Sequence, residues 1–196
     1  MPKNAQQSPP RAAGSQRVRA VLRSAAGALL ALLALSTLPA LGETEALRTG
    51  DPAPPFTLPG TDGNTHRLSD YAGRWVVLAF FPKAYTGGCT IECKALRDAS
   101  QELGAFDVAY FMASTDNLED NRGFAAQNNA NFPLLSDASK TVAEAYGVLR
   151  DNGLARRWTF YIDPEGIIQR VDRTVDPASA GATLVKNLRN LGAPES

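Results

Sequence analysis

Three short runs of the sequence are apolar at nearly every position, and they constrain the fold more than any other feature. They cover residues 74–81 (RWVVLAFF), 106–114 (FDVAYFMAS) and 158–162 (WTFYI). A strand with one face in water alternates apolar and polar residues, so runs without alternation predict strands that are buried on both faces. A sheet of such strands must be covered by helices, which predicts an α/β domain.

Helical patterns and turn signals separate these runs. An early hairpin is expected within residues 56–73, where Pro-Gly and Asp-Gly turns divide short β-like pieces. Residues 167–173 follow an Asp-Pro-Glu-Gly turn and should pair back as a hairpin strand. Helices are expected over residues 90–103, from a capping box at Asp116 and Glu119 to about Asn128, over residues 139–146, and from Asp176 to about Leu191. This order predicts a thioredoxin-like α/β fold with an N-terminal β-hairpin addition.

The first 42 residues differ from the rest of the chain. Five basic residues and no acidic one are followed by an apolar run, which ends in small residues at Ala40-Leu41-Gly42. This layout predicts a secretory signal peptide over residues 1–42, a mature domain over 43–196, and a periplasmic or other extracytoplasmic location. The alternative is an uncleaved inner-membrane anchor, because the apolar run lies at the lower edge of the length that spans a bilayer.

Charge and residue counts exclude several classes of function. All 20 acidic residues but only 15 of the 20 basic ones follow residue 42, so the predicted mature domain has a net charge of −5. An acidic domain without a basic run gives no support to nucleic-acid binding. One histidine and two cysteines are too few for a Cys/His zinc site, and no metal or cofactor is expected.

Both cysteines lie in one segment, residues 82–93 (PKAYTGGCTIEC). Cys89 falls in the first turn of an expected helix, where free backbone N–H groups and the helix dipole favour a thiolate. Gly87 and Gly88 allow the backbone to approach a small ligand closely. The plainer interpretation is a buried cysteine that acts only as a small apolar residue, preceded by an ordinary turn.

Cys93 lies four positions after Cys89 and therefore on the same helix face. The Cβ atoms of such a pair are about 5–6 Å apart, whereas a disulfide needs about 3.8 Å. A permanent bridge is therefore not expected on a regular helix, but a transient disulfide could form after oxidation if the first turn unwinds. The alternative for Cys93 is a packed and inert thiol.

The residues around Cys89 resemble a known family. Pro82, Thr86 and Cys89 match the Pro-x-x-x-(Thr/Ser)-x-x-Cys signature of peroxiredoxins. The following CTIECKALRD is similar to the bacterioferritin-comigratory (PrxQ-like) branch, and the similarity extends over residues 47–192. One departure concerns the resolving cysteine, which in this branch lies five positions after the first one. Lys94 occupies that position here, and the cysteine lies one position earlier.

The resemblance implies a role for each matching residue. Cys89 would be the peroxidatic thiolate, Thr86 would hydrogen-bond the thiolate and the peroxide, and Pro82 would shield the pocket from water. Arg157, two residues before the Thr-Phe pair of the third run, would stabilise the thiolate and polarise the O–O bond. Cys93 takes the resolving role by proximity. Arg156 is expected on the surface, and Arg97 is a structural candidate only.

The activity that follows from the resemblance is a thiol peroxidase. It would reduce hydrogen peroxide and organic hydroperoxides through a cysteine sulfenic acid, and a thioredoxin-like dithiol protein would recycle it. The branch is often monomeric, so a monomer or weak homodimer is expected.

Two other functions fit parts of the pattern. A Sco-type copper chaperone uses Cys-x-x-x-Cys with a histidine, but the required histidine comes late in those proteins, whereas His66 precedes the cysteines here. A TlpA-like thiol–disulfide oxidoreductase needs Cys-x-x-Cys after a tryptophan, which this chain lacks. His66 is expected to be a surface residue of the hairpin.

Overall fold

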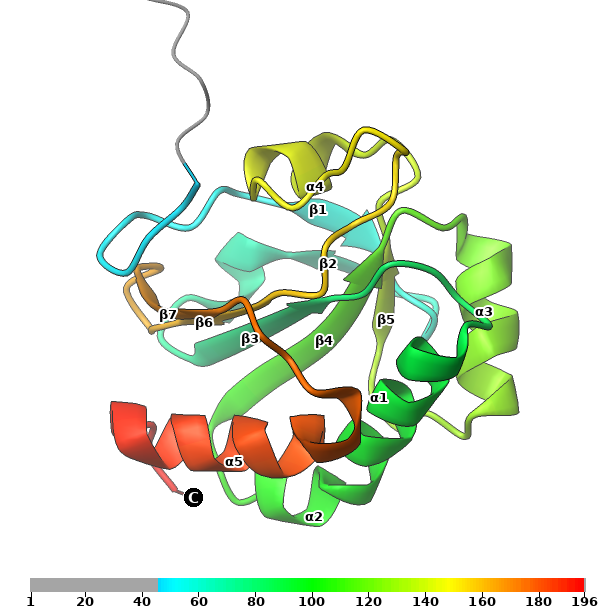
Figure 1. Ribbon diagram of the computed structural model, residues 1–196. Coiled ribbons are helices and arrows are strands. Elements are labelled where there is room, and N and C mark those ends of the chain that lie inside the picture. The colour runs from blue at the N-terminus through cyan, green and yellow to red at the C-terminus, as the bar shows by residue number, and fades with distance from the viewer. Residues whose placement is uncertain (1–45, 196) are drawn as a thin grey trace, which may run out of the picture. The chain divides into compact units, whose positions relative to one another are not determined.

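The computed structural model describes residues 46–195 and shows a five-stranded mixed sheet in the order β5-β4-β3-β6-β7 (Figure 1). β3 is parallel to β4 and antiparallel to β6, so the three apolar runs lie side by side at the centre, as predicted. The predicted signal peptide lies outside the described residues. The strands are β3 (Trp75–Phe80), β4 (Val108–Ser114), β5 (Leu134–Ser136), β6 (Thr159–Ile162) and β7 (Ile168–Asp172).

The sheet is buried on both faces, because successive residues of β3 belong to two different cores. Val77 and Ala79 pack with the helices on one face, whereas Val76 and Leu78 pack on the other face with the N-terminal hairpin and its neighbours. All six residues of β3 are buried. The continuous apolar pattern of this strand is thus explained by its central position.

Helices cover the sheet as the pattern predicts, with small shifts at their ends. The segment expected as one helix over residues 90–103 is two helices, with a break at Ala99, and the first begins three residues earlier. The helices are α1 (Gly87–Asp98), α2 (Ser100–Leu103), α3 (Leu118–Gln127), α4 (Thr141–Ala145) and α5 (Ala180–Leu191), with 3₁₀ turns η1 (Leu68–Tyr71) and η2 (Pro177–Ser179).

The predicted N-terminal hairpin forms a separate two-stranded antiparallel sheet, β1 (Thr57–Pro59) with β2 (Thr65–Arg67). His66 on β2 corrects an expectation, since it is only 7% exposed. Its ring nitrogens lie within hydrogen-bond distance of Tyr71 and Asp62, and its ring contacts Phe111. His66 was expected to point to water because it lies in a hairpin. This hairpin packs on the central sheet, and the packing buries the His66 ring.

Two further details differ from the sequence-based prediction. The N-cap of α3 is Asn117, whose side chain accepts from the backbone N–H of Asp120, so the capping box expected at Asp116 is wrong by one position. Asp116 instead accepts a 2.8 Å hydrogen bond from the backbone N–H of Ala84, which ties two loops together. The edge strand β5 was not predicted, because its three residues are too few to show a periodic pattern.

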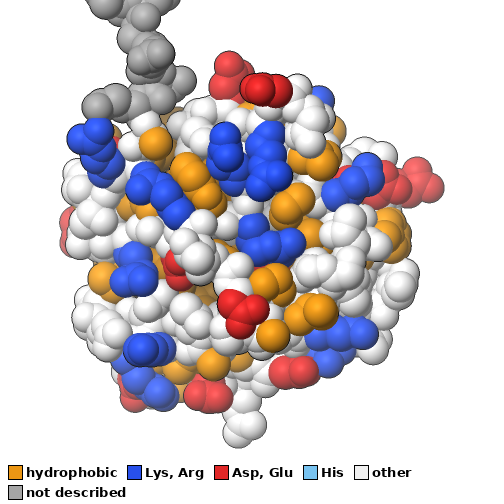
Figure 2. All heavy atoms as spheres, in the orientation of Figure 1, with side chains coloured by type: hydrophobic (Ala, Val, Ile, Leu, Met, Phe, Trp, Pro, Cys, Tyr) orange, Lys and Arg blue, Asp and Glu red, His pale blue; other side chains and the backbone are white. Residues whose placement is uncertain are grey.

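On the face drawn in Figure 2, lysine and arginine side chains are interspersed with hydrophobic side chains and some acidic ones. The net negative charge expected of the domain therefore does not describe this face. Within residues 46–195, no helix is long and apolar enough to cross a bilayer.

Gly181 allows α5 to pack closely on α1, and we expect its substitution to destabilise the fold. A Cβ at this position would overlap the backbone carbonyl oxygen of Ala95. Gly181→Ala should lower the free energy of unfolding in urea by about 1–3 kcal/mol, the usual cost of overpacking. Gly87→Ala is the matched control, because a Cβ there meets no atom within 4 Å. Equal stability of the two variants would contradict the close packing of α1 on α5.

Candidate active site

Cys89 lies in the first turn of α1, directly after the loop that leaves β3. Thr86 is the N-cap, and its carbonyl accepts the first helical hydrogen bond from Thr90, at 2.9 Å. The Cys89 side chain is fully buried, in the core between α1 and the sheet. A thiolate here would lie at the positive end of the helix dipole, as the sequence predicted.

Arg157 is the cationic partner of Cys89. Its Nη2 donates to the Cys89 Sγ at 3.3 Å. β6 runs antiparallel to β3, with Thr159 opposite Ala79, so residues just before β6 lie beside the end of β3 and the start of α1. Gly88 permits the approach, because a Cβ there would lie 3.1 Å from Arg157 Nη2.

Glu92 completes the group, and it was not identified from the sequence. Its Oε2 accepts a hydrogen bond from Arg157 Nη1, and its side chain is buried. Burial raises the pKa of Glu92 to about 7, although Arg157 acts in the opposite direction. Burial of the guanidinium acts to lower the pKa of Arg157, but the charges of Glu92 and Cys89 raise it overall. The signal was the spacing, because Glu92 follows Cys89 by three positions and shares its helix face.

Cys93 is buried one turn after Cys89, in the same core, and both cysteines are free thiols. Burial raises the pKa of Cys93 to about 11, with a further contribution from the charge of Glu92. At neutral pH Cys93 is therefore a protonated thiol. The two cysteines are close in the chain and in the core, but an intact helical turn separates them.

The other residues named by the resemblance lie in the loop before α1, on α1 itself and beside Arg157 in the chain. The Thr86 hydroxyl donates to the Lys83 carbonyl at 2.9 Å, on the exposed side of the loop. Pro82 follows β3 and is half-buried. Arg156 is exposed, as expected, and Arg97 donates to the Asn128 carbonyl at 2.8 Å. The structure thus brings Arg157 to Cys89 and leaves Thr86 and Pro82 in the loop before the helix.

The arrangement does not resemble a metal centre. Within residues 46–195, no three Cys, His, Asp or Glu side chains are grouped so that they could hold a metal ion. His66 contacts Phe111, which belongs to the core on the opposite face of the sheet from Cys89. The copper-chaperone alternative, which needs a histidine beside the cysteines, is therefore not favoured.

A thioredoxin-like fold that holds a buried cysteine at a helix N-terminus, beside a half-buried guanidinium, defines a thiol-based redox enzyme. The family model of the AhpC/TSA family matches residues 49–171. The chain is 39% identical to peroxiredoxin Bcp of Escherichia coli over 132 residues, which cover 64% of this chain and 85% of the relative. It is 34% identical to a thioredoxin peroxidase of Fasciola hepatica over 158 residues, 75% and 80% of the two chains.

Solved structures give the same result. Peroxidoxin BcpB of Mycobacterium tuberculosis superimposes with a TM-score of 0.68 and 33% sequence identity, over 74% of this chain and 97% of that one. The chain therefore belongs to the AhpC/TSA family and is a peroxiredoxin of the Bcp/PrxQ type, a peroxidase that uses a thiol.

The raised pKa of Glu92 predicts a pH-dependent stability. The folded protein keeps the Glu92 proton up to about pH 7, whereas an unperturbed glutamate releases it near 4.5. The folded state therefore binds more protons across this window, and Glu92 makes stability fall as pH rises through it. In Glu92→Gln, urea unfolding should show a smaller fall between these pH values than in the wild type.

The matched control is Glu102→Gln, which makes the same chemical change at an exposed glutamate of α2. It should keep the wild-type dependence on pH. If Glu92→Gln also kept it, Glu92 would titrate as an ordinary carboxyl group, contrary to its burial.

Proposed function

We propose that Cys89 is the peroxidatic residue and that the enzyme reduces hydrogen peroxide and organic hydroperoxides. The contact that carries this proposal is the 3.3 Å hydrogen bond from Arg157 to the Cys89 sulfur. The thiolate attacks one peroxide oxygen, the S–O bond forms and the O–O bond breaks. Cys89 becomes a sulfenic acid, and the leaving oxygen departs as an alkoxide or hydroxide that takes up a proton. The Arg157 guanidinium stabilises both the thiolate and the negative charge that develops on the leaving oxygen.

Thr86 and Pro82 serve the same pocket in this proposal. Thr86 lies at the helix N-cap, three residues from Cys89, and its hydroxyl reaches thiolate and peroxide after turning away from the Lys83 carbonyl. Pro82 covers one side and has no backbone N–H to attract water. The helix N-terminal N–H groups add further stabilisation of negative charge.

Cys93 resolves the sulfenic acid. Its sulfur bonds to that of Cys89, the sulfenic hydroxyl leaves, and the thiol proton leaves with it as water. Because the cysteines are one helical turn apart, the first turn of α1 must open for this step. The close contact of Gly181 with Ala95 fixes the second half of α1 on α5, so the opening is confined to the N-terminal part of α1.

A thioredoxin-like dithiol protein then reduces the disulfide by thiol exchange and is itself oxidised. The similarity to a protein named thioredoxin peroxidase supports this class of reductant. We propose a monomer or a weak homodimer as the working form.

We also propose that residues 1–42 are a cleaved signal peptide and that the enzyme acts in the periplasm or another extracytoplasmic space. The basic, apolar and small-residue segments of this part of the sequence support that proposal. N-terminal sequencing of the exported protein should begin at Glu43. A chain that retains its apolar segment would instead be a membrane-anchored form.

Separate substitution of the two cysteines tests their roles. Cys89→Ser should abolish peroxide turnover with thioredoxin as the electron donor. Cys93→Ser should still be oxidised once by peroxide, but its sulfenic acid should persist and be labelled by dimedone, as peptide mass spectrometry would show. Peroxidase turnover of Cys89→Ser would contradict the assignment, and normal thioredoxin-dependent turnover of Cys93→Ser would indicate a one-cysteine cycle.

Neighbouring arginines provide a matched test of the guanidinium. Arg157→Gln should lower the second-order rate constant for peroxide by about 10²–10³, as removal of a transition-state donor does in other enzymes. Arg156→Gln should leave it unchanged, because Arg156 is exposed and lies 5.9 Å from the ring centre of Trp158. Stopped-flow oxidation measures both. Equal rate constants for the two variants would remove Arg157 from the mechanism.

A further inference from the structure

Tyr85 has an unusual backbone conformation at the entrance to α1. It directly precedes Thr86, the N-cap of that helix, and it is 52% exposed. Its φ angle of 64° lies in the left-handed region, which residues other than glycine rarely adopt. Within residues 46–195 only two other non-glycine residues, Asn129 and Lys140, have a positive φ. Such a conformation persists where surrounding contacts hold it, and it is often found at functional sites.

The contacts that hold Tyr85 come from α3. Its ring meets the ring of Phe124 edge to face, with the ring centres 5.6 Å apart. Its phenol lies against Gly123, where an added Cβ would overlap the hydroxyl oxygen. Any larger side chain at position 123 would therefore displace the phenol, and the contact depends on glycine at this position of α3.

The rest of the loop before α1 is held by the same part of the fold. Phe81, where the loop begins, stacks on Phe124 with the ring centres 5.8 Å apart. Between Phe81 and Tyr85, the backbone N–H of Ala84 donates to Asp116, which lies just before α3. Both ends of the loop therefore contact one aromatic ring, and the contact of Tyr85 is the one nearest to the start of α1.

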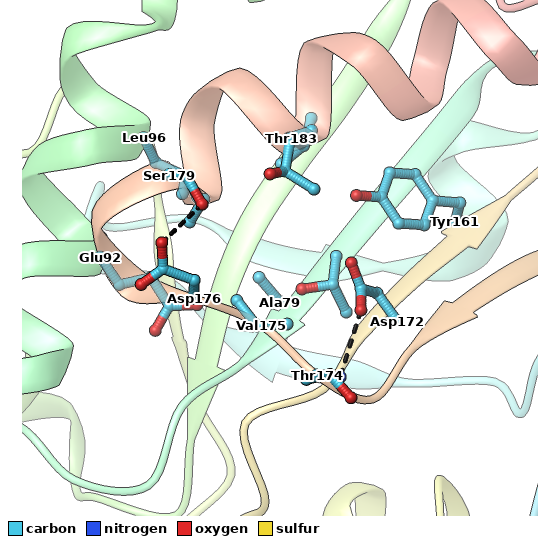
Figure 3. A pocket seen from close by; sticks show the side chains of 13 residues that line it. Ala79, Glu92, Leu96, Tyr161, Asp172, Thr174, Val175, Asp176, Ser179 and Thr183 are labelled. Atoms are coloured by element: carbon cyan, nitrogen blue, oxygen red, sulfur yellow. Dashed lines mark hydrogen bonds between the residues drawn. The ribbon is translucent and has the colours of Figure 1, made fainter.

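On the side of α5, the packing of α1 is less complete. Figure 3 shows Glu92 and Leu96 of α1 beside a pocket of about 80 Å³, which residues of β6, η2 and α5 also line. Side chains that border a void have fewer contacts on that side. At the first turn, a Cβ added to Gly88 would meet Pro177 only at an ordinary contact distance, 3.7 Å. The contacts between the loop and α3 therefore contribute more to the closed conformation of this turn.

We propose that Tyr85 is a positioning residue that holds the first turn of α1 closed for the peroxide step and leaves α3 when this turn opens for the disulfide. The inference rests on the proposed roles of Cys89 and Cys93. In the closed state, the conformation of Tyr85 directs the chain into α1 at Thr86. When the turn opens, this direction is released, and the φ angle of Tyr85 can return to an ordinary value. That change turns its Cβ atom and moves the ring away from Gly123.

The proposal separates the two chemical steps. The closed state places Arg157 beside the Cys89 sulfur and reacts with peroxide, whereas the open state allows the sulfurs of Cys89 and Cys93 to bond. A contact made only in the closed state favours that state, so loss of the contact raises the population of the open one. While the open state is the minor one, the rate of disulfide formation is proportional to its population. Loss of the contact should therefore speed the second step but not the first.

Tyr85→Ala tests the contribution of the ring. Peptide mass spectrometry of quenched samples after mixing with peroxide gives the rate of Cys89 oxidation and the rate at which the linked Cys89–Cys93 peptide appears. Disulfide formation should be about three to ten times faster than in the wild type, the size expected for one aromatic contact, and oxidation by peroxide should not be faster. Tyr85→Phe keeps the ring and should restore the wild-type rates. Slowing of both steps by the same factor, or an unchanged rate of disulfide formation in Tyr85→Ala, would overturn the inference.

Gly123→Ala tests the same contact from α3. The added methyl group overlaps the Tyr85 hydroxyl oxygen but lies 3.6 Å from Cζ, an ordinary contact distance. The substitution should therefore speed disulfide formation in the wild-type background but not in Tyr85→Phe, which lacks that oxygen. The variant should fold, because alanine is favoured over glycine within a helix. An equal effect of Gly123→Ala in both backgrounds would show that it does not act through the phenol, and the inference would fail.

Ile91→Ala is the matched control for the loss of apolar surface. Ile91 is the other large hydrophobic residue exposed within residues 46–195, at 49%, and it lies on α1 two positions after Cys89. Because alanine favours a helix more than isoleucine does, this variant should not speed disulfide formation. A gain equal to that of Tyr85→Ala would show that any lost apolar surface near Cys89 opens the turn, which would refute a specific role of Tyr85.

Hydrogen exchange in the reduced protein separates this inference from the proposed function. The Thr90 amide donates to the Thr86 carbonyl in the first turn of α1, whereas the Ala99 amide lies at the other end of the helix. Tyr85→Ala should raise the exchange rate of the Thr90 amide by about three to ten times and leave that of Ala99 unchanged. Unchanged exchange at Thr90 would overturn the inference and leave Cys89 as the peroxidatic residue. Peroxidase turnover by Cys89→Ser would instead disprove the proposed function, whatever the exchange rates.

Discussion

The hydrogen bonds of the Arg157 guanidinium are the interactions on which the site depends. They join two groups on α1, the Cys89 sulfur and the Glu92 carboxylate, to the segment that leads into β6, 68 positions away from Cys89 in the chain. Arg157 is half-buried, so its charge is partly shielded from water and is stabilised by an ionised partner, which it stabilises in turn. Cys89, Glu92 and Arg157 therefore act as one coupled group, in which both acids interact with the same guanidinium.

The fold provides this contact through the direction of its central strands. The chain runs from β3 into the start of α1, and the antiparallel strand β6 begins beside the end of β3. Arg157 and Cys89 therefore meet at the C-terminal end of β3. Gly88 leaves room for the guanidinium. Gly181 brings α5 onto the second half of α1. In the proposed mechanism the N-terminal part of the helix rearranges while the rest remains packed.

The two acids that share Arg157 differ in what they contribute. In the proposed mechanism Cys89 supplies the nucleophile, whereas burial raises the pKa of the Glu92 carboxyl group to about 7. Cys93 has its pKa raised to about 11, also mainly by burial, so it acts as a thiol. Burial is thus the main cause of the raised pKa of both Glu92 and Cys93, which are neighbours on α1.

The sequence by itself determined the buried sheet, the helices that cover it and the segment that carries the cysteine chemistry, because these follow from local patterns in β3, β4 and α1. It indicated Arg157 only through a family resemblance. The tertiary structure decided what depends on distant contacts: the burial of His66 under the hairpin, the short strand β5, and the N-cap at Asn117. It also decided the role of Glu92. In the sequence this residue is one polar position between two cysteines, and only the tertiary structure buries it, pairs one of its oxygens with Arg157 and leaves the other without a hydrogen-bond partner among residues 46–195.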